Sequence, residues 1–282
     1  MSSLPIGEII TCFVKADKEG TGTIDETKLV VALQDMHPDL PEEKAKQIIE
    51  SSNAGRGQVN YMLFLDWVFQ ILDKSAGSFC SKFSICPYGV LGTQMTLQRK
   101  MANNAAEPGP DIAIVDPAGV HYICNIGPSG AGGAAGVIYK WLGINKDPSF
   151  PEPVRTAITG PLLAKFYDYG EKKCIHVIGP DFRMRDYSQK EAVLELALSY
   201  YGIFREFIIS GLPILRLLPV SGGIFSGPFG PVLPQITAEA VEAGFSFLSD
   251  EQKEQLLKAQ ALEMCIFMES ELAQFQQTFA AR

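Results

Sequence analysis

Hydrophobic residues change their spacing along the chain. Residues 5–15, 41–50 and 60–72 each place apolar side chains at intervals of three and four, the spacing of one helix face. After Pro110 the pattern changes to short β-rich runs, DIAIVD and VHYICN, which precede a helical stretch, AGVIYKWLG. A helical domain followed by an α/β domain is therefore predicted.

The last segment, residues 249–282, contains neither glycine nor proline. Ser249 and Gln252 have the spacing of a capping box, and apolar residues recur in steps of three and four from Leu257 to Phe279. This pattern predicts one amphipathic helix of about 30 residues. Its first half is expected to cover the sheet, and its second half either to project as a partner surface or to pack on the helical first segment.

These changes divide the 282-residue chain into four parts. We expect a helical domain over 1–74, a linker running into an edge strand over 75–108, an α/β domain over 109–248 and the C-terminal helix over 249–282. Two domains of ordinary size are consistent with this length.

Composition restricts the classes of partner. The formal net charge of -8 provides no basic face for the phosphates of a nucleic acid. Six cysteines without a CxxC pair, and only three histidines, predict neither a zinc site nor a disulfide framework, and no cofactor is expected. No secretory leader or membrane span is evident, so we expect a cytoplasmic protein that is not secreted and that could associate with the cytoskeleton.

The polar string DKEGTGTIDETK, residues 17–28, resembles the calcium loop of an EF-hand. The residues at ligand positions that could contact calcium are Asp17, Glu19, Thr21 and Asp25. The twelfth position is Lys28, which places an ammonium group where calcium needs a bidentate glutamate. Calcium binding by this loop is therefore not expected.

A second loop of the same kind, aligned on Val59, starts at Ser52 and has Ala54 and Arg56 at ligand positions. We therefore expect a degenerate EF-hand pair over residues 1–74. Five apolar residues of its last helical stretch are expected in the core or on a partner surface: Phe64, Trp67, Val68, Phe69 and Ile71.

A glycine-rich turn, GPSGAGGAAG at 127–136, lies between an apolar run and a helical one. Glycines let a backbone approach a ligand closely, and the amides of a following helix N-terminus favour an anion such as a diphosphate. Residues 130–135 also match the loose GxGxxA dinucleotide-binding fingerprint. A Rossmann unit, however, needs an acidic residue about 20 positions further on, where this chain has the proline-rich NKDPSFPEPV.

Four segments in order resemble the macro-domain family, which binds ADP-ribose. They are Asp111-Ile112, the string YICN with the glycine-rich turn, AITG and IHVIGP within 152–183, and LRLLPVSGGIFSGP at 215–228. The resemblance implies a macro-type three-layer α/β/α domain with a mixed sheet. The expected fold class is thus α/β, with a small all-α domain before this domain and a long helix after it.

The resemblance also implies roles for individual residues. Asp111, followed by Ile112, would accept a hydrogen bond from the adenine amino group. Asn125 would face the distal ribose, and Phe225 would pack beside that ribose. The backbone positions implied to contact the ribose and the diphosphate are Gly130, Gly132, Gly133, Ser221, Gly222, Gly223 and Ile224.

Whether the domain is an enzyme stays open. Hydrolysis needs a polar group that activates water. One hydrolase branch of the family uses an aspartate after the glycine loop, where this chain has Ala135. Another branch has alanine there and relies on an asparagine, so Asn125 is the catalytic candidate. His176 lies in an apolar run and is expected to be a core residue with satisfied hydrogen bonds.

The expected function is binding of ADP-ribose or an ADP-ribosylated partner. Two alternatives stay open: a mono-ADP-ribosyl hydrolase of the asparagine-dependent type, and a ligand-silent scaffold, a pseudoenzyme within a cytoskeletal or ciliary assembly. Protein partners are expected to contact residues 1–74 and 255–282. In a silent domain, Tyr122 or Phe225 would fill the ribose pocket.

Overall fold

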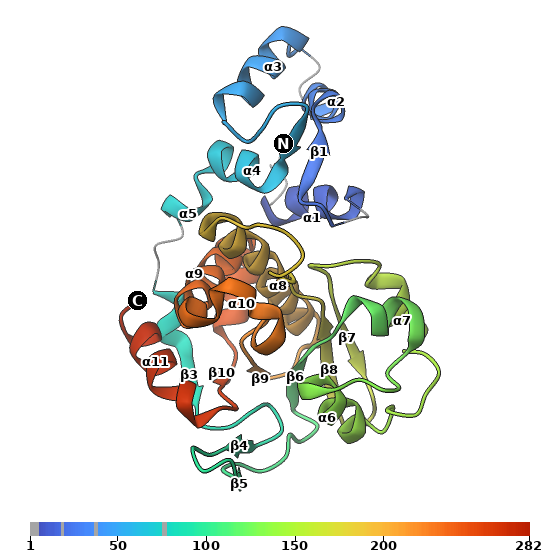
Figure 1. Ribbon diagram of the computed structural model, residues 1–282, viewed down its shortest axis with the longest axis vertical. Coiled ribbons are helices and arrows are strands. Elements are labelled where there is room, and N and C mark those ends of the chain that lie inside the picture. Colours follow the sequence, from blue (N-terminus) through green and yellow to red (C-terminus); the bar gives the residue numbers. More distant parts are fainter. Residues whose placement is uncertain (1–5, 18–19, 37–38, 75–77) are drawn as a thin grey trace.

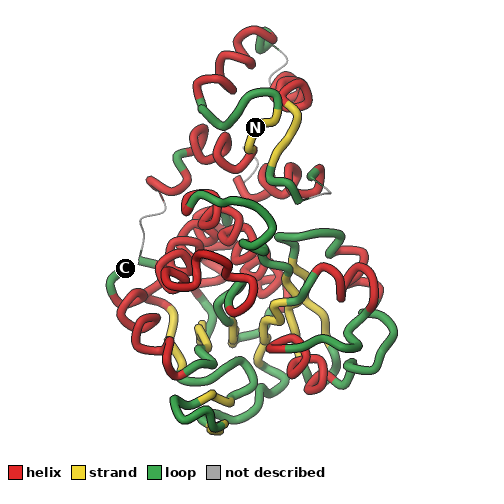
Figure 2. Tube along the Cα trace, viewed as in Figure 1, coloured by secondary structure: helices red, strands yellow, loops and turns green. Residues whose placement is uncertain are grey.

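The computed structural model describes residues 6–17, 20–36, 39–74 and 78–282. An N-terminal module, residues 6–74, stands on a larger sheet domain, residues 78–282 (Figures 1 and 2). In the described part of the chain, no helix combines the length and the apolar character needed to cross a bilayer.

The N-terminal module consists of helices and one small two-stranded sheet. Its elements are α1 (Ile6–Ala16), β1 (Thr23–Asp25), α2 (Glu26–Met36), α3 (Glu42–Ser51), β2 (Gln58–Asn60), α4 (Tyr61–Phe69) and α5 (Ile71–Lys74). The two strands pair antiparallel, with Ile24 opposite Val59. Helices α1, α3 and α4 thus lie where the hydrophobic spacing predicts them, whereas α2 was not predicted from that spacing.

The sheet domain is built on a mixed sheet of six strands in the order β3-β10-β9-β6-β8-β7. In that order the strands are Phe83–Cys86, Ala261–Cys265, Ile214–Leu217, Ile112–Pro117, Lys173–Val177 and Ala164–Asp168. Only β7 runs antiparallel to its neighbour within this sheet. The α/β class with a mixed sheet is confirmed.

Helices cover both faces of the sheet, which makes three layers. One face packs on α8 (Gln189–Ser210), α9 (Leu233–Ser246), α10 (Asp250–Leu257) and α11 (Glu269–Ala280). The other packs on α6 (Gly133–Leu142) and α7 (Glu152–Ala157). Side chains alternate between the faces, because Ala113 and Val115 belong to the first core and Ile114 to the second.

Shorter elements complete the domain, among them a π-helical turn (Tyr122–Ile126) between β6 and α6. A 3₁₀ helix (Phe79–Lys82) precedes β3, and the chain between β3 and β6 forms the hairpin of β4 (Thr93–Met95) and β5 (Met101–Asn103). Another 3₁₀ helix, η3 (Gly223–Val232), follows β9. Residues 83–86 form the edge strand β3, and the following segment, up to β6, contains this hairpin.

The chain ends in a helix, but the single uninterrupted helix expected over 249–282 is wrong. The capping box of Ser249 and Gln252 is present and begins α10, which ends at Leu257. Residues 261–265 then form β10, between β3 and β9. Short apolar runs suit a buried strand and a helix equally, and burial inside the sheet outweighs a helix preference of a few tenths of a kcal/mol per residue.

Helix α11 closes the edge of the sheet domain. It packs on α9 and β3, and the rings of Phe279 and Phe83 lie 6.2 Å apart. Phe275 and Phe279 are buried. The second half of the tail therefore neither projects nor packs on the N-terminal module, so both expectations for it are wrong.

The two modules share one continuous hydrophobic core. Helices α1 and α4 pack on α8, and the cluster that includes Ile10 and Phe64 runs into the sheet domain. A Cβ on Gly7 would stand 2.2 Å from Cζ of Tyr201, so glycine lets α1 approach α8 closely.

The apolar residues predicted for the core or for a partner surface divide between the two. Phe64 and Ile71 are buried, whereas Trp67 and Val68 are exposed.

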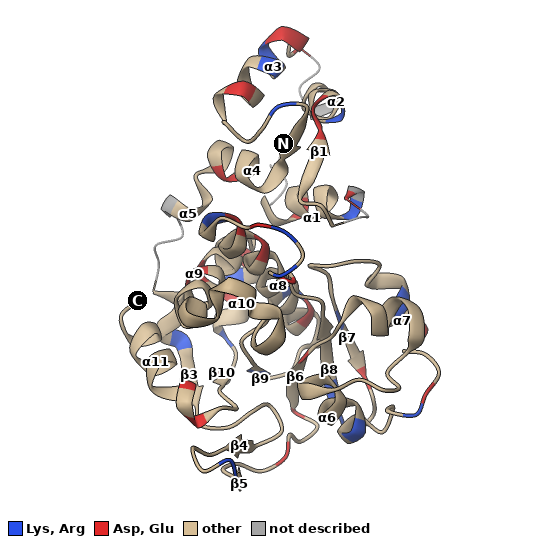
Figure 3. Cartoon of the chain, in the orientation of Figure 1, with Lys and Arg blue, Asp and Glu red and all other residues tan. Residues whose placement is uncertain are grey.

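A polar network centred on Glu191 joins the modules beside this core. Oε1 of Glu191 accepts hydrogen bonds from Asn60 Nδ2 at 2.6 Å and from Arg185 Nη1 at 3.2 Å. Oε2 accepts from the backbone nitrogen and the hydroxyl of Ser188 at 2.9 and 2.6 Å, within the capping box of α8. Arg185 also pairs with Glu195. Figure 3 shows acidic and basic residues interspersed on the segment before α8, below the N-terminal module.

Replacing Glu191→Gln is expected to destabilise the fold by about 1–3 kcal/mol, because an NH₂ group then faces hydrogen-bond donors. Burial alone would raise the pKa of Glu191, but hydrogen bonds from Ser188 and Arg185 lower it below 4.5 overall. A lowered carboxyl pKa adds stability above the unfolded-state pKa, and this stability is lost as pH falls through the folded-state pKa. Denaturant unfolding at pH 7 and below pH 4 should therefore show the variant's deficit shrinking in acid.

The matched control is Glu42→Gln, which removes an exposed carboxylate paired with Lys46. We expect no measurable change in unfolding free energy for this variant. An equal loss in both variants, or a deficit for Glu191→Gln that does not depend on pH, would contradict the role assigned to Glu191.

Candidate functional site

Three parallel strands bring their carboxyl ends to one edge of the sheet. β6 pairs with β9 on one side and with β8 on the other. The glycine-rich turn at 127–136 follows β6. Of the segment predicted to contain the second phosphate loop, 215–228, residues 218–225 follow β9. Neighbouring strands lie about 4.8 Å apart, so the two connections leave the sheet side by side. Ligands of open α/β sheets bind outside such carboxyl ends.

The first loop begins with a turn that differs from the expected structure. The run VHYICN was predicted as a strand, but residues 122–126 form a short π-helical turn. The strand is the preceding run, and β6 ends at Pro117. Proline has no amide to donate to a ladder, and Gly119 follows closely, which ends the strand before the second apolar run.

The first glycine loop leads into α6, whose N-cap is Gly132. No side chain caps this helix. A Cβ at Gly130, Gly132 or Gly133 would meet no atom within 4 Å beyond its local backbone. The faces of these glycines are therefore open, and the first-turn amides of α6 are left for an anion.

Other glycines of this loop have a structural role instead. A Cβ at Gly127 would lie 2.4 Å from the carbonyl oxygen of Pro148, and Gly127 has a φ of 78°. A Cβ at Gly136 would lie 2.2 Å from the carbonyl oxygen of Ala131. Glycine is thus required at both positions for the loop to close on its surroundings.

The second loop is held in an unusual backbone conformation. Ser221 and Gly223 both have a φ of 59°, and extended Gly222 lies between them. Left-handed residues of this kind are typical of turns, and turns can present backbone amides to an anion. The buried Ser221 hydroxyl donates to the Pro180 carbonyl oxygen at 2.6 Å, which fixes the loop to the chain after β8. A Cβ at Gly223, like one at Gly130, Gly132 or Gly133, would meet no atom within 4 Å beyond its local backbone.

A cation lies beside this second loop. The guanidinium carbon of Arg183 stands 5.0 Å from the centre of the Phe225 ring. Arg183 also binds both oxygens of Asp181, at 2.8 and 2.6 Å, and these hydrogen bonds lower the pKa of that carboxyl. Phe225 is half-buried beneath Arg183, and Ile224 is 72% exposed at the rim.

The structure does not bring Asp111 and Ile112 to these loops. Asp111 precedes the amino end of β6, whereas both loops lie beyond carboxyl ends. Six strand residues separate the two edges by about 20 Å. The role implied for Asp111, as the acceptor of the adenine amino group in this cleft, is therefore wrong.

Asn125 lies on the π-helical turn and is exposed. Its amide nitrogen stands 3.4 Å from Nδ1 of His121. On the same turn, the Tyr122 hydroxyl donates to the Gly130 carbonyl oxygen at 3.4 Å. Tyr122 therefore touches the margin of the first loop, while the open glycine faces remain uncovered.

A buried polar chain lies at the carboxyl ends of β6 and β8. Asp116 and His176 face each other in the register of β6 and β8, with Oδ2 of Asp116 2.7 Å from Nδ1 of His176. The other ring nitrogen lies 2.9 Å from the Tyr169 hydroxyl. Asp116 and His176 are fully buried, so the prediction that His176 is a satisfied core residue is confirmed.

Sequence reasoning missed Asp116. The available signal was the alternation of DIAIVDP and KCIHV, which places Asp116 on the face of Ile114, and His176 on that of Cys174. Burial, and then the charge of Asp116, raise the pKa of the adjacent Tyr139 hydroxyl well above its usual range.

Two carboxylates of the loop at 17–28 accept hydrogen bonds from backbone nitrogens of the same loop. Asp17 accepts hydrogen bonds from the backbone nitrogens of Thr21 and Gly22 at 3.0 and 2.7 Å. Asp25 accepts from the backbone nitrogens at the start of α2, and Glu19 lies outside the described residues. Across the described ranges, no three His, Cys, Asp or Glu side chains form a group that could hold a metal ion.

No protein-family model matches this sequence, and no curated protein matches it. Among solved structures, the chain is similar to the Oceanobacillus iheyensis macrodomain with ADP, at 14% identity over 69% of this chain and 88% of that chain, with a TM-score of 0.44. It is also similar to the Trypanosoma brucei macrodomain in complex with ADP, at 14% identity over 74% and 85%, with a TM-score of 0.39.

A third similar structure is described as alphavirus P23pro-zbd, at 14% identity over 64% of this chain, with a TM-score of 0.43. The chain spans 25% of the length of that protein. Macrodomains are thus structural neighbours of this chain at low identity.

The glycines of the first loop should separate into two classes on substitution. Gly127→Ala is expected to cost about 2 kcal/mol or more of unfolding free energy, because it adds both a clash and a strained φ. Gly132→Ala should change it by no more than about 0.5 kcal/mol, because its φ is -107° and its surroundings are open. Denaturant unfolding of both variants measures the difference, and equal losses would show that the loop has another shape.

Proposed function

We propose that this protein binds ADP-ribose, free or attached to a protein, between the loops that follow β6 and β9. The observation that carries the proposal is the juxtaposition of two open glycine loops at the carboxyl ends of neighbouring parallel strands. One loop supplies a helix N-terminus without a side-chain cap, and the other supplies alternating left-handed and extended backbone. Both features favour a phosphate group.

The chemistry of the cleft suits a diphosphate carried by a sugar. Amides give affinity without a strongly basic surface, which agrees with a net charge of -8. Arg183, paired with Asp181, stacks on Phe225 beside the second loop and adds guanidinium donors there. Asn125 and Tyr122 add polar groups at the first loop, where the distal ribose would lie.

Binding is proposed ahead of hydrolysis because of where the titratable groups lie. Asp116 and His176 are fully buried and bound to each other, so neither is free to activate a water molecule in the cleft. Ala135 occupies the position at which one hydrolase branch carries aspartate. Asn125, the candidate predicted from the sequence, cannot accept a proton at neutral pH, and the imidazole of His121 lies 3.4 Å from its amide nitrogen.

The test is calorimetric titration of ADP-ribose into the full chain, where we expect micromolar binding. Gly132→Glu should weaken it at least tenfold, because a carboxylate would then occupy the open face and repel the diphosphate. The matched control is Gln277→Glu, which adds the same charge on an exposed position of α11.

Unchanged affinity in Gly132→Glu would remove the first loop from the site, and no heat from the unmodified chain at high concentration would overturn the proposal. Release of free ADP-ribose from a mono-ADP-ribosylated protein, abolished by Asn125→Ala, would instead favour the hydrolase.

We further propose that residues 1–74 are a degenerate EF-hand pair. Counted from Asp17 and Ser52, the eighth loop positions are Ile24 and Val59, and these two residues pair across the small sheet. The carboxylate of Asp17 stabilises its own loop through backbone amides. The twelfth position is Lys28, which cannot supply the two oxygen ligands that calcium needs there, and this supports a loop that no longer binds the metal.

This proposal predicts that millimolar calcium leaves the melting temperature of the full chain unchanged. Lys28→Glu restores the bidentate position and should introduce a calcium-dependent rise in melting temperature, with weak affinity near the millimolar range. Lys28→Gln, which removes the charge without adding two oxygens, is the control. Calcium stabilisation of the unmodified chain would contradict the proposal.

A further inference from the structure

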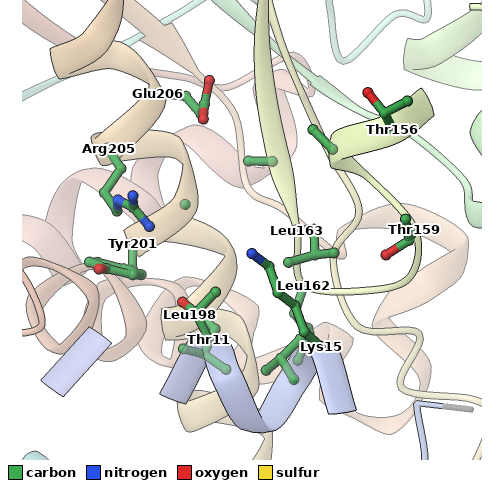
Figure 4. Close-up of a pocket in the computed structure, with 14 residues that line it drawn as sticks. Thr11, Lys15, Thr156, Thr159, Leu162, Leu163, Leu198, Tyr201, Arg205 and Glu206 are labelled. Atoms are coloured by element: carbon green, nitrogen blue, oxygen red, sulfur yellow. The ribbon is translucent and has the colours of Figure 1, made fainter. Parts of the chain in front are cut away.

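A hollow of about 480 Å³ lies where the N-terminal module meets the sheet domain. Its walls are α1, α8 and the chain that connects α7 to β7 (Figure 4). This connection approaches β8, since the Leu162 backbone nitrogen donates to the Ile178 carbonyl oxygen at 2.7 Å. The volume falls in the range of small-molecule sites, about 300–1,000 Å³.

The lining combines an apolar surface with a few polar groups, which is the usual composition of a ligand site. The apolar side chains are Val14, Ala157, Leu162, Leu163, Ala164 and Leu198. Hydroxyls come from Thr11, Thr156, Thr159 and Tyr201, and both Thr156 and Thr159 stand exposed at the rim. An occupant would therefore have an apolar body and a polar end.

The charges on the wall favour an anion as that polar end. Lys15 and Arg205 extend into the space from α1 and α8 (Figure 4). Among the described residues Lys15 has no ion-pair or hydrogen-bond partner. Arg205 has one carboxylate partner there, Glu8, at a long 3.4 Å.

The one acid on the wall, Glu206, does not neutralise Lys15. Its Oε2 accepts hydrogen bonds from Lys165 Nζ at 3.1 Å and from the Phe166 backbone nitrogen at 2.8 Å. The Glu206 carboxylate is thus paired with groups on β7. The ammonium of Lys15 therefore remains as an uncompensated positive charge beside the apolar surface of the hollow.

We propose that this hollow is a binding site for a small organic anion with an apolar body, separate from the cleft at the glycine loops. The anionic group lies between Lys15 and Arg205, and the apolar body lies against Leu162, Leu163 and Leu198. Because Lys15 belongs to the N-terminal module and the other groups to the sheet domain, the bound anion bridges the two modules and stabilises their contact.

The test uses 1-anilinonaphthalene-8-sulfonate as the organic anion and N-phenyl-1-naphthylamine as its uncharged counterpart, each titrated into the full chain by fluorescence. We expect saturable one-to-one binding of the sulfonate, weakened about fivefold or more by Lys15→Met. Thr159→Trp should abolish it, because the indole fills the rim of the hollow. The uncharged probe should bind weakly and should not respond to Lys15→Met.

Two control variants test whether the sulfonate occupies this hollow and no second surface. Lys28→Met removes a lysine of the same module outside the hollow and should leave sulfonate binding unchanged, as should Gly132→Glu in the first glycine loop. Circular dichroism melts confirm that each variant is folded. Equal sulfonate binding by the unmodified chain, Lys15→Met and Thr159→Trp would overturn the proposal, whatever the result for ADP-ribose.

Discussion

The structure depends on one constraint: four neighbouring strands, β10, β9, β6 and β8, run in the same direction and are buried on both faces. Parallel strands need crossover connections, and these place helices on the two faces of the sheet. All four carboxyl ends then meet at one edge. The two glycine loops adjoin each other for this reason, although about 80 residues of chain separate them.

Helix α8 connects this arrangement to the N-terminal module. It covers one face of the sheet, and its other side receives α1 and α4. Glu191, in its first turn, accepts hydrogen bonds from both modules, so the capping box of a helix is also the polar link between domains. The N-terminal loop that resembles a calcium site lies close to this link, where a Cβ on Gly22 would meet Arg185. The module is therefore packed as part of one body.

Features with local causes could be predicted from the sequence. The capping box at Ser249, the glycine loops and the first helices each depend on residues close together in the chain. The strand β10 could not be predicted in this way, because its stability comes from β3 and β9, each distant in sequence. A helical pattern without glycine or proline therefore indicates one long helix where the structure has two helices and a strand.

The same distinction between local and long-range causes applies to the candidate site. The open glycines were evident from spacing, whereas the position of Asp111 required knowing which apolar run is the strand. That run is DIAIVDP, so Asp111 precedes the amino end of β6, and Asp116 is buried close to its carboxyl end. The contact of Asp116 with His176 is set by the register of two strands, which a single sequence does not reveal.

The central claim is that both glycine loops contact the same ligand. A ¹H–¹⁵N correlation spectrum of the full chain during titration with ADP-ribose tests this most directly. We predict saturable shifts with one common midpoint for the amides of residues 130–135 and 221–225. Shifts confined to one loop, or to the hollow between α1 and α8, would contradict it.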